Sequence, residues 1–204
     1  GDDHQISAGE AEALFQVNDA CHQASSNWPV FFVESIVDFL ISNSQPNGYI
    51  SESQAQWLTT HIAQSGVVKG ETELETLVKL MEMASAVPDR LELFAMNQVK
   101  NAVLEGSGPT RKGSVLEPGK IGTAEIELLR RILSACASQD SAAISRFEAE
   151  MVCDINDAIP TENKSATWTD FFVKVVANYL MAVRGFQPIS REQASHREAW
   201  LNEE

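Results

Sequence analysis

The sequence predicts an all-α fold, a helical bundle of about eight or nine helices that contains an internal duplication. Three observations lead to this prediction. Apolar residues recur at helical spacing through most of the chain, several of these stretches open with a capping-box pattern, and no run of alternating β-branched residues between turns marks a strand. The similarity of two distant stretches further suggests two halves packed around a pseudo-twofold axis.

The duplication is clearest between residues 6–20, ISAGEAEALFQVNDA, and residues 144–158, ISRFEAEMVCDINDA, which agree at eight of fifteen positions. Each copy opens with a Ser that is followed three residues later by a Glu, and this pattern predicts Ser7 and Ser145 as helix N-caps. Apolar residues then recur at helical spacing in both copies. We therefore predict an amphipathic helix with one buried face in each.

The similarity extends to a second predicted helix in each copy. Residues 28–32, WPVFF, match residues 168–172, WTDFF, at a shift of 140, and both continue into apolar residues at helical spacing. Aromatic clusters on one helix face are typical of a core. We expect Trp28 and Trp168 to be mostly buried at equivalent helix starts, whereas two exposed indoles would suggest anchors for a partner.

A third capping box completes the repeated unit. It begins at Ser51 in the first copy and at Ser190 in the second, so each copy is predicted to continue into a third helix. Residues 6–58 and 144–201 are therefore expected to superpose as three-helix units.

The chain is predicted to divide into a first helical half, residues 1–105, a linker or long loop, residues 106–120, and a second half, residues 121–204. The first half adds two helices to its repeat unit, near residues 70–85 and 89–104. The loop contains four Gly and two Pro without periodicity, which is typical of a connection.

Composition and charge exclude several classes of function. With 204 residues and 44% hydrophobic content, the chain can bury a core. Fifteen Lys and Arg against 29 Asp and Glu give a net charge of −14, which argues against nucleic acids and anionic membranes as partners. An acidic surface favours solubility, cations or a basic protein partner.

Two features of the sequence concern the cellular compartment of the protein: its cysteines and its first residue. Three cysteines without a CxxC pair indicate a reducing compartment, and no apolar run is long enough for a membrane span. We therefore expect a cytoplasmic protein. The first residue is Gly rather than Met, which leaves room for a removed leader.

The best candidate for a site is the Asn-Asp pair that recurs late in both copies of the first helix. In a structural interpretation, Asn18 and Asn156 bond the backbone of the turn before Trp28 and Trp168, because an amide on a core face needs partners. The aspartates that follow then face solvent.

In the functional alternative, four carboxylates are candidate metal ligands. Asp19 and Asp157 converge on a divalent cation with Glu12 or Glu150 from nearby surfaces. Glu12 and Asp19 lie seven residues apart on one helix, about 10 Å along its axis, so they cannot hold one ion alone.

A short sequence pattern that occurs three times resembles one found in a known family. A glycine, a β-branched residue two positions on, and then a helix start with an acid or amide appear at residues 48–54, 66–73 and 119–125. Through this pattern the chain resembles the TerB-like family, which are tellurite-resistance-associated all-helical proteins. The turns of that family have the form Asp-Gly-x-Ile-x-x-x-Glu. The resemblance implies an all-α fold and acidic metal binding. The residue before the glycine is not Asp in any of the three; it is Asn47, Ser65 or Pro118.

Catalytic patterns are missing from the sequence. It contains no HxxxH, GxSxG or GxxxxGK[ST] pattern, and an EF-hand alignment places Leu116 and Pro118 where calcium ligands belong. We predict a non-enzymatic protein without an organic cofactor that acts as a binding or protein-interaction module, with a stress association if the TerB-like resemblance holds. The alternative is a divalent-metal or small-ligand-binding protein that uses acidic residues near the repeat interface. Its oligomeric state is left open.

Overall fold

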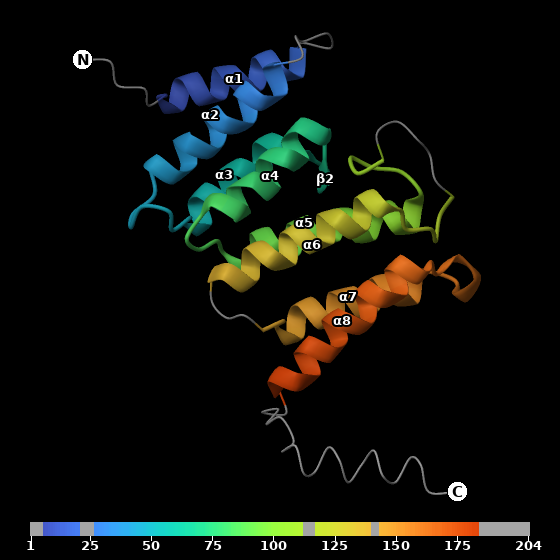
Figure 1. Cartoon of the computed structure of the whole chain (residues 1–204). Helices are drawn as coiled ribbons and strands as arrows, with labels where there is room; N and C mark the ends of the chain where they lie inside the picture. Colours follow the sequence, from blue (N-terminus) through green and yellow to red (C-terminus); the bar gives the residue numbers. More distant parts are fainter. Residues whose placement is uncertain (1–5, 21–26, 112–116, 140–142, 184–204) are drawn as a thin grey trace, which may run out of the picture.

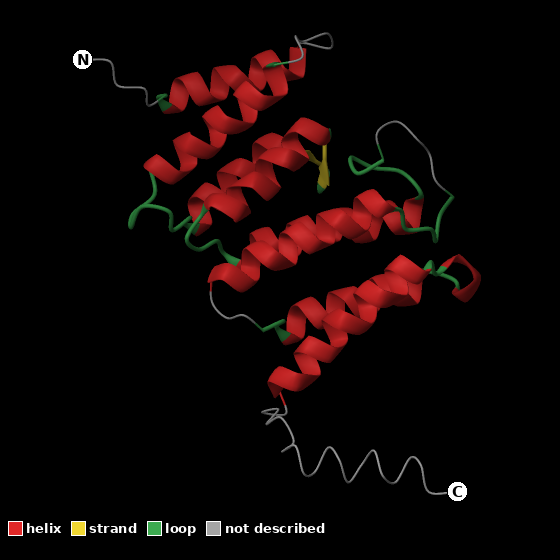
Figure 2. Ribbon diagram, viewed as in Figure 1, coloured by secondary structure: helices red, strands yellow, loops and turns green. Residues whose placement is uncertain are grey.

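The computed structural model describes residues 6–20, 27–111, 117–139 and 143–183, and these residues confirm the predicted all-α class. Figure 2 shows that helices make up nearly all of the fold. The eight α-helices in the described residues are α1 (Ala8–Ala20), α2 (Trp28–Ser42), α3 (Glu52–Ile62), α4 (Glu71–Met83), α5 (Asp89–Glu105), α6 (Thr123–Gln139), α7 (Arg146–Ala158) and α8 (Ala166–Val183). None of them is both long and apolar enough to cross a membrane.

Consecutive helices pair into four hairpins, α1–α2, α3–α4, α5–α6 and α7–α8, which stack in chain order (Figure 1). The even-numbered helices form one layer, in which α2 packs on α4, α4 on α6, and α6 on α8. In the other layer α3 packs on α5, and α5 on α7. This is the arrangement of an α-solenoid, in which each helix pair contacts mainly its neighbours.

Helices α2 and α8, whose sequences match at a shift of 140, lie at opposite ends of the stack and turn different faces inward. Val33 and Leu40 of α2 are buried, while their counterparts Val173 and Leu180 of α8 are exposed. A twofold axis would turn the same face inward at both ends. The predicted pseudo-twofold packing is therefore wrong, because the hairpins follow one another along the stack.

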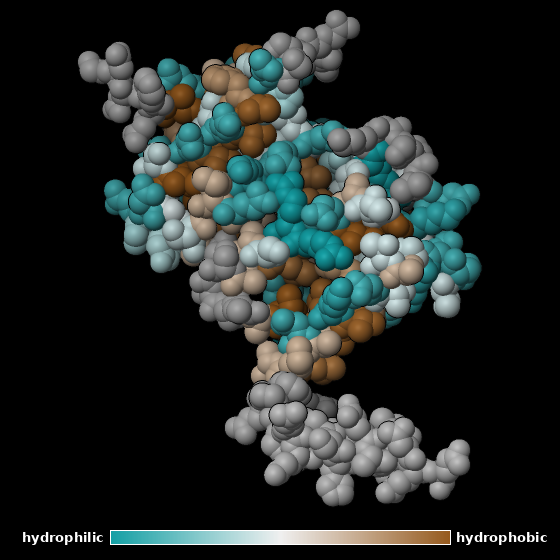
Figure 3. All heavy atoms as spheres, viewed as in Figure 1, coloured by the Kyte–Doolittle hydropathy of each residue, from teal (hydrophilic) through white to brown (hydrophobic). Residues whose placement is uncertain are grey.

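One hydrophobic core runs through all four hairpins and across the predicted boundary at residues 106–120. Polar side chains cover much of the surface in Figure 3, while apolar surface remains along α8. The largest fully buried side chains include Phe32, Leu58, Met81, Met96, Leu129 and Trp168. Both predicted halves thus contribute to the same core.

The predicted N-caps explain where three of these helices begin. Ser7, Ser51 and Ser145 each accept a hydrogen bond from the amide three residues on, at 3.3, 3.2 and 3.1 Å. In each case the Glu or Gln at that position accepts a hydrogen bond from the N-cap amide in return. Two of the first four amide donors of each helix are thereby satisfied.

A two-stranded hairpin between α3 and α4, β1 (Ala63–Gln64) and β2 (Val67–Val68), was not predicted. Its strands are two residues long, too short to leave an alternating pattern in the sequence. The buried Gln98 of α5 fixes this hairpin, since its Oε1 accepts from the Val68 amide at 2.9 Å.

The described parts of the loop at residues 106–120 are tied to the start of α6. Gly106 ends α5 in the left-handed conformation, at a φ of 71°. Beyond it, Arg111 and Glu125 form a buried ion pair at 3.3 Å, and Arg111 Nη2 donates to the Lys120 carbonyl at 2.7 Å. The loop therefore helps to set the position of α6 between its neighbours.

Candidate metal centre

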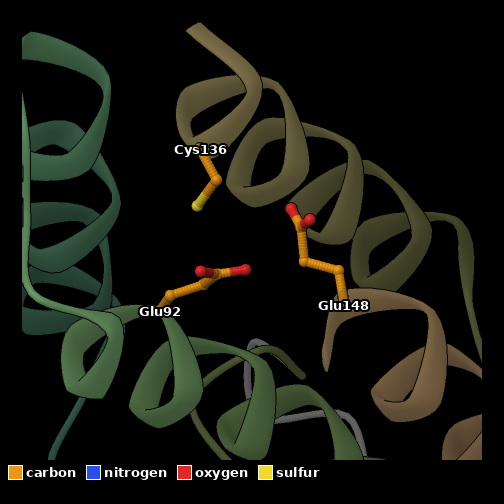
Figure 4. A group of neighbouring side chains, drawn as sticks. All are labelled: Glu92, Cys136 and Glu148. Carbon is orange, nitrogen blue, oxygen red and sulfur yellow. The ribbon is translucent and has the colours of Figure 1, made fainter. Parts of the chain in front are cut away.

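Three side chains that can ligate a metal meet where the third and fourth hairpins pack together. Glu92 comes from α5, Cys136 from α6 and Glu148 from α7, and Figure 4 shows them pointing into a common space. One ligand atom from each lies within 4.8 Å of the others. No other group of three Asp, Glu, Cys or His side chains comes this close within the described residues.

Each of the three is held in place by its own helix. Glu148 is the third residue of α7 and completes the capping box, in which its Oε2 accepts the Ser145 amide hydrogen bond at 2.6 Å. Cys136 lies in the last turn of α6. Glu92 lies in the first turn of α5, four residues before the fully buried Met96, so helical spacing turns it toward the core.

The two carboxylates lack a compensating cation. Among the described residues neither Glu92 nor Glu148 forms an ion pair, because Arg90 pairs with Glu52 at 3.5 Å and the arginine at the start of α7 pairs with Glu150 at 2.7 Å. Glu92 Oε1 is closed off from solvent and has no hydrogen-bond partner in the part of the chain that the structure describes. Such an arrangement is costly unless a proton or a cation occupies it.

In the absence of a cation, protons occupy the cluster. Burial is the main cause that raises the pKa of the Glu92 carboxyl to about 7. The charge of Glu148 and a hydrogen bond with it raise this pKa further, and so does the charge of Asp89. Burial, followed by the charges of Glu92 and Glu148, raises the pKa of the Cys136 thiol well above its ordinary value. At neutral pH the thiol is therefore protonated, and Glu92 keeps its proton to a higher pH than an ordinary carboxyl does.

The donor set is suited to a divalent ion that accepts both sulfur and oxygen. A thiolate and two carboxylates are ligands found at Zn²⁺ sites, with metal–ligand distances of roughly 2.0–2.3 Å, so small side-chain adjustments would bring the ligand atoms to about 3.5 Å apart. A cavity of about 540 Å³ opens on the three side chains and leaves space for water as a further ligand. The geometry thus resembles a three-ligand site with an open position.

The structure does not bring the four sequence-predicted carboxylates together. Glu12 and Asp19 lie on α1 and Glu150 and Asp157 on α7, at opposite ends of the stack (Figure 1). All four are exposed, and Asp19 forms an ion pair with Lys69 at 2.7 Å. The convergence hypothesis fails because two hairpins separate α1 from α7.

Both asparagines form side-chain hydrogen bonds, and their partner differs from the one predicted. Asn18 Oδ1 accepts a hydrogen bond from the Trp28 indole at 2.9 Å, and Asn156 Oδ1 accepts one from the Trp168 indole at 3.2 Å. The predicted partner was the backbone of the preceding turn. Trp168 is fully buried as expected, whereas Trp28 is half-buried. Asn18 Nδ2 also donates to Glu73 Oε1 at 2.6 Å.

A second cavity, of about 620 Å³ and lined mainly by α2, α4 and α6, offers a poorer site. Arg131, which lines this cavity, is already bound by two carboxylates. Arg131 makes contacts of 2.7 Å to both Glu75 and Glu82. Arg131 is therefore already neutralised within the protein.

Comparison with protein-family models, with curated proteins and with solved structures found no match to this chain.

Proposed function

We propose that this protein binds a divalent transition-metal ion through Glu92, Cys136 and Glu148. The observation that carries the proposal is the convergence of three ligand atoms within 4.8 Å from three different helices, without a compensating cation among the described residues. A dication at this point would satisfy the buried Glu92 oxygen and offset two of the three negative charges of the carboxylates and the thiolate.

The thiol supports an ion of the Zn²⁺ or Co²⁺ type over Mg²⁺ and Ca²⁺. The latter two prefer shells made of oxygen ligands, usually six or more, whereas a thiolate favours softer ions. Binding must also displace the Cys136 proton and, near pH 7, part of the Glu92 proton. We therefore expect the release of between about one and two protons for each ion bound.

Titration of the chelator-treated full chain with Co²⁺ and Zn²⁺ tests the proposal. Co²⁺ should produce a thiolate-to-metal charge-transfer band in the near ultraviolet, and Zn²⁺ should displace it. Glu92→Gln, Cys136→Ser and Glu148→Gln should each weaken binding at least about tenfold, because each removes a ligand. Glu148→Gln is informative because Gln also completes a capping box and so retains the start of α7.

Two substitutions on α7 serve as matched controls. Glu150→Gln and Cys153→Ser change the same residue types outside the cluster and should leave the affinity unchanged. Equal Zn²⁺ affinity in the parent chain and in Cys136→Ser would contradict the proposal, as would a Co²⁺ complex without the thiolate band. Equally tight binding of Mg²⁺ would contradict the predicted selectivity.

A further inference from the structure

The repeat counterparts α2 and α8 have exchanged their buried and exposed positions. Phe31 of α2 is 52% exposed, whereas its counterpart Phe171 is buried against α6, with the Arg130 guanidinium 5.2 Å from its ring centre. Conversely, Leu40 is buried and its counterpart Leu180 is 45% exposed. The two helices therefore have similar sequences, but the neighbouring hairpin packs against one face of α2 and against a different face of α8.

The uncovered side of α8 forms a continuous apolar face. We define the α8 face by Val173, Leu180, Met181 and Val183, which are between 44% and 64% exposed. Figure 3 shows apolar surface over this helix. A contiguous patch of this kind on an otherwise acidic protein indicates a surface that another element covers.

The contacts of α2 show what covers the equivalent face. The second hairpin packs on it, and α3 makes a specific polar contact: the Gln54 side-chain amide donates to the Leu40 carbonyl at 2.8 Å. Gln54 is also the third residue of the Ser51 capping box, so one side chain both starts α3 and ties it to α2. Trp57 of α3 adds a ring contact to Phe39 of α2, with centres 5.5 Å apart.

The sequence that follows α8 contains the same residues, in the same order, as the sequence that follows α2 at three key positions. Ile189 and Ser190 repeat Ile50 and Ser51, and Gln193 stands three residues after Ser190 as the counterpart of Gln54. The separation from Leu180 to Ser190 is one residue shorter than the separation from Leu40 to Ser51. These residues lie outside the part of the chain that the structure describes.

We propose that residues 189–201 of the same chain cover the α8 face as α3 covers α2, with the Gln193 side-chain amide donating to the Leu180 carbonyl. The segment supplies Trp200 and Leu201 as apolar side chains for the contact. A continuation of the stack beyond α8 accounts for the exposed apolar residues there, because the last unit of an α-solenoid presents a polar outer face and the α8 face is apolar.

Hydrogen–deuterium exchange of the full chain tests this proposal. In the parent protein the amides of residues 193–201 should exchange at least about a hundredfold more slowly than in an isolated peptide of that sequence. Leu180→Glu places a charge on the α8 face and should return these amides to near the peptide rate. Gln193→Ala should give an intermediate effect.

Val30→Glu is the matched control, because Val30 is a 59% exposed apolar residue on α2, away from the α8 face. It should leave exchange at residues 193–201 unchanged. Val183→Glu, at the last residue of α8, replaces Leu180→Glu if the latter also raises exchange within α8. Exchange at the peptide rate in the parent would overturn the proposal, and so would protection that Leu180→Glu leaves intact. Protection that appears only at high protein concentration would assign the face to a second copy and would also overturn it.

Discussion

Asn156 accepts a hydrogen bond from the Trp168 indole at 3.2 Å, across the connection between α7 and α8. Asn18 and Trp28 make the same contact at 2.9 Å between α1 and α2. An indole N–H that is removed from water needs an acceptor, and the preceding helix supplies it in both hairpins. The paired bonds fix how the second helix of each hairpin lies on the first.

Replacing Asn156 by Leu should destabilise the protein by about 1–3 kcal/mol, because the fully buried Trp168 N–H loses its acceptor. Asn18→Leu should have a similar effect, since it also removes the donor that Glu73 uses. Urea denaturation followed by tryptophan fluorescence measures both. Gln16→Leu, at an exposed position of α1, is the control, and an Asn156→Leu midpoint equal to that of the control would contradict the prediction.

The raised pKa of Glu92 predicts a specific dependence of stability on pH in metal-free buffer. The folded protein holds this proton up to about pH 7, whereas the unfolded chain releases it near 4.5. The contribution of Glu92 to stability is therefore full below pH 4.5 and is lost as the pH rises from 4.5 to about 7. Allowing for the exposed part of the side chain, we expect a loss on the order of 1–2 kcal/mol.

Denaturation of the parent and of Glu92→Gln across this pH range isolates the effect, since all other titrating groups are common to both. The parent should lose more stability than the variant as the pH rises. Parallel curves would show that Glu92 titrates normally.

Cys136 should react slowly with thiol reagents, because its raised pKa leaves little thiolate at neutral pH. We expect a brief iodoacetamide treatment at pH 7.5 to label Cys136 at least about tenfold more slowly in the native protein than in the urea-unfolded chain. Peptide mass spectrometry resolves it from Cys153, whose pKa is also raised by burial and neighbouring carboxylates. Equal labelling of Cys136 in both states would contradict the prediction.

The buried pair Arg111–Glu125 should behave as an anchor of the loop rather than as a gain in stability by itself. Arg111→Met leaves the Glu125 charge buried without its partner and should cost about 3–5 kcal/mol. Adding Glu125→Gln removes that charge and retains an acceptor for the Gly122 amide, so the double variant should be more stable than Arg111→Met by at least about 1 kcal/mol. Thermal unfolding of the two variants measures the difference.

Local features of the fold could be predicted from the sequence because they depend on residues close together in the chain. The Ser145 capping box, the apolar spacing of each helix and the glycine that ends α5 act within a few residues. The β1–β2 hairpin was missed because it is so short. The partner of Asn156 was misassigned because its indole partner lies on the next helix, where only packing decides the contact.

The candidate metal centre could not be predicted for the same reason. Glu92 and Cys136 are 44 residues apart, and Glu148 was recognised only as part of a helix cap. One signal was present: Glu92 stands four residues before Met96 on the apolar side of its helix, a position where an acid needs an explanation. Which side chains meet it depends on how three helices cross, and no local pattern encodes that.

The stacking of hairpins in chain order also affects how this protein folds and where it unfolds first. Most long-range contacts join a helix to one next to it or two beyond it, so the chain closes small loops as it folds, which favours rapid folding. In such a linear array, a destabilising change in one unit affects mainly the adjacent units. The free energy of local unfolding is lower for the outer units than for the inner ones. A substitution in α1 should therefore loosen the first hairpin long before α5 and α6 respond to it.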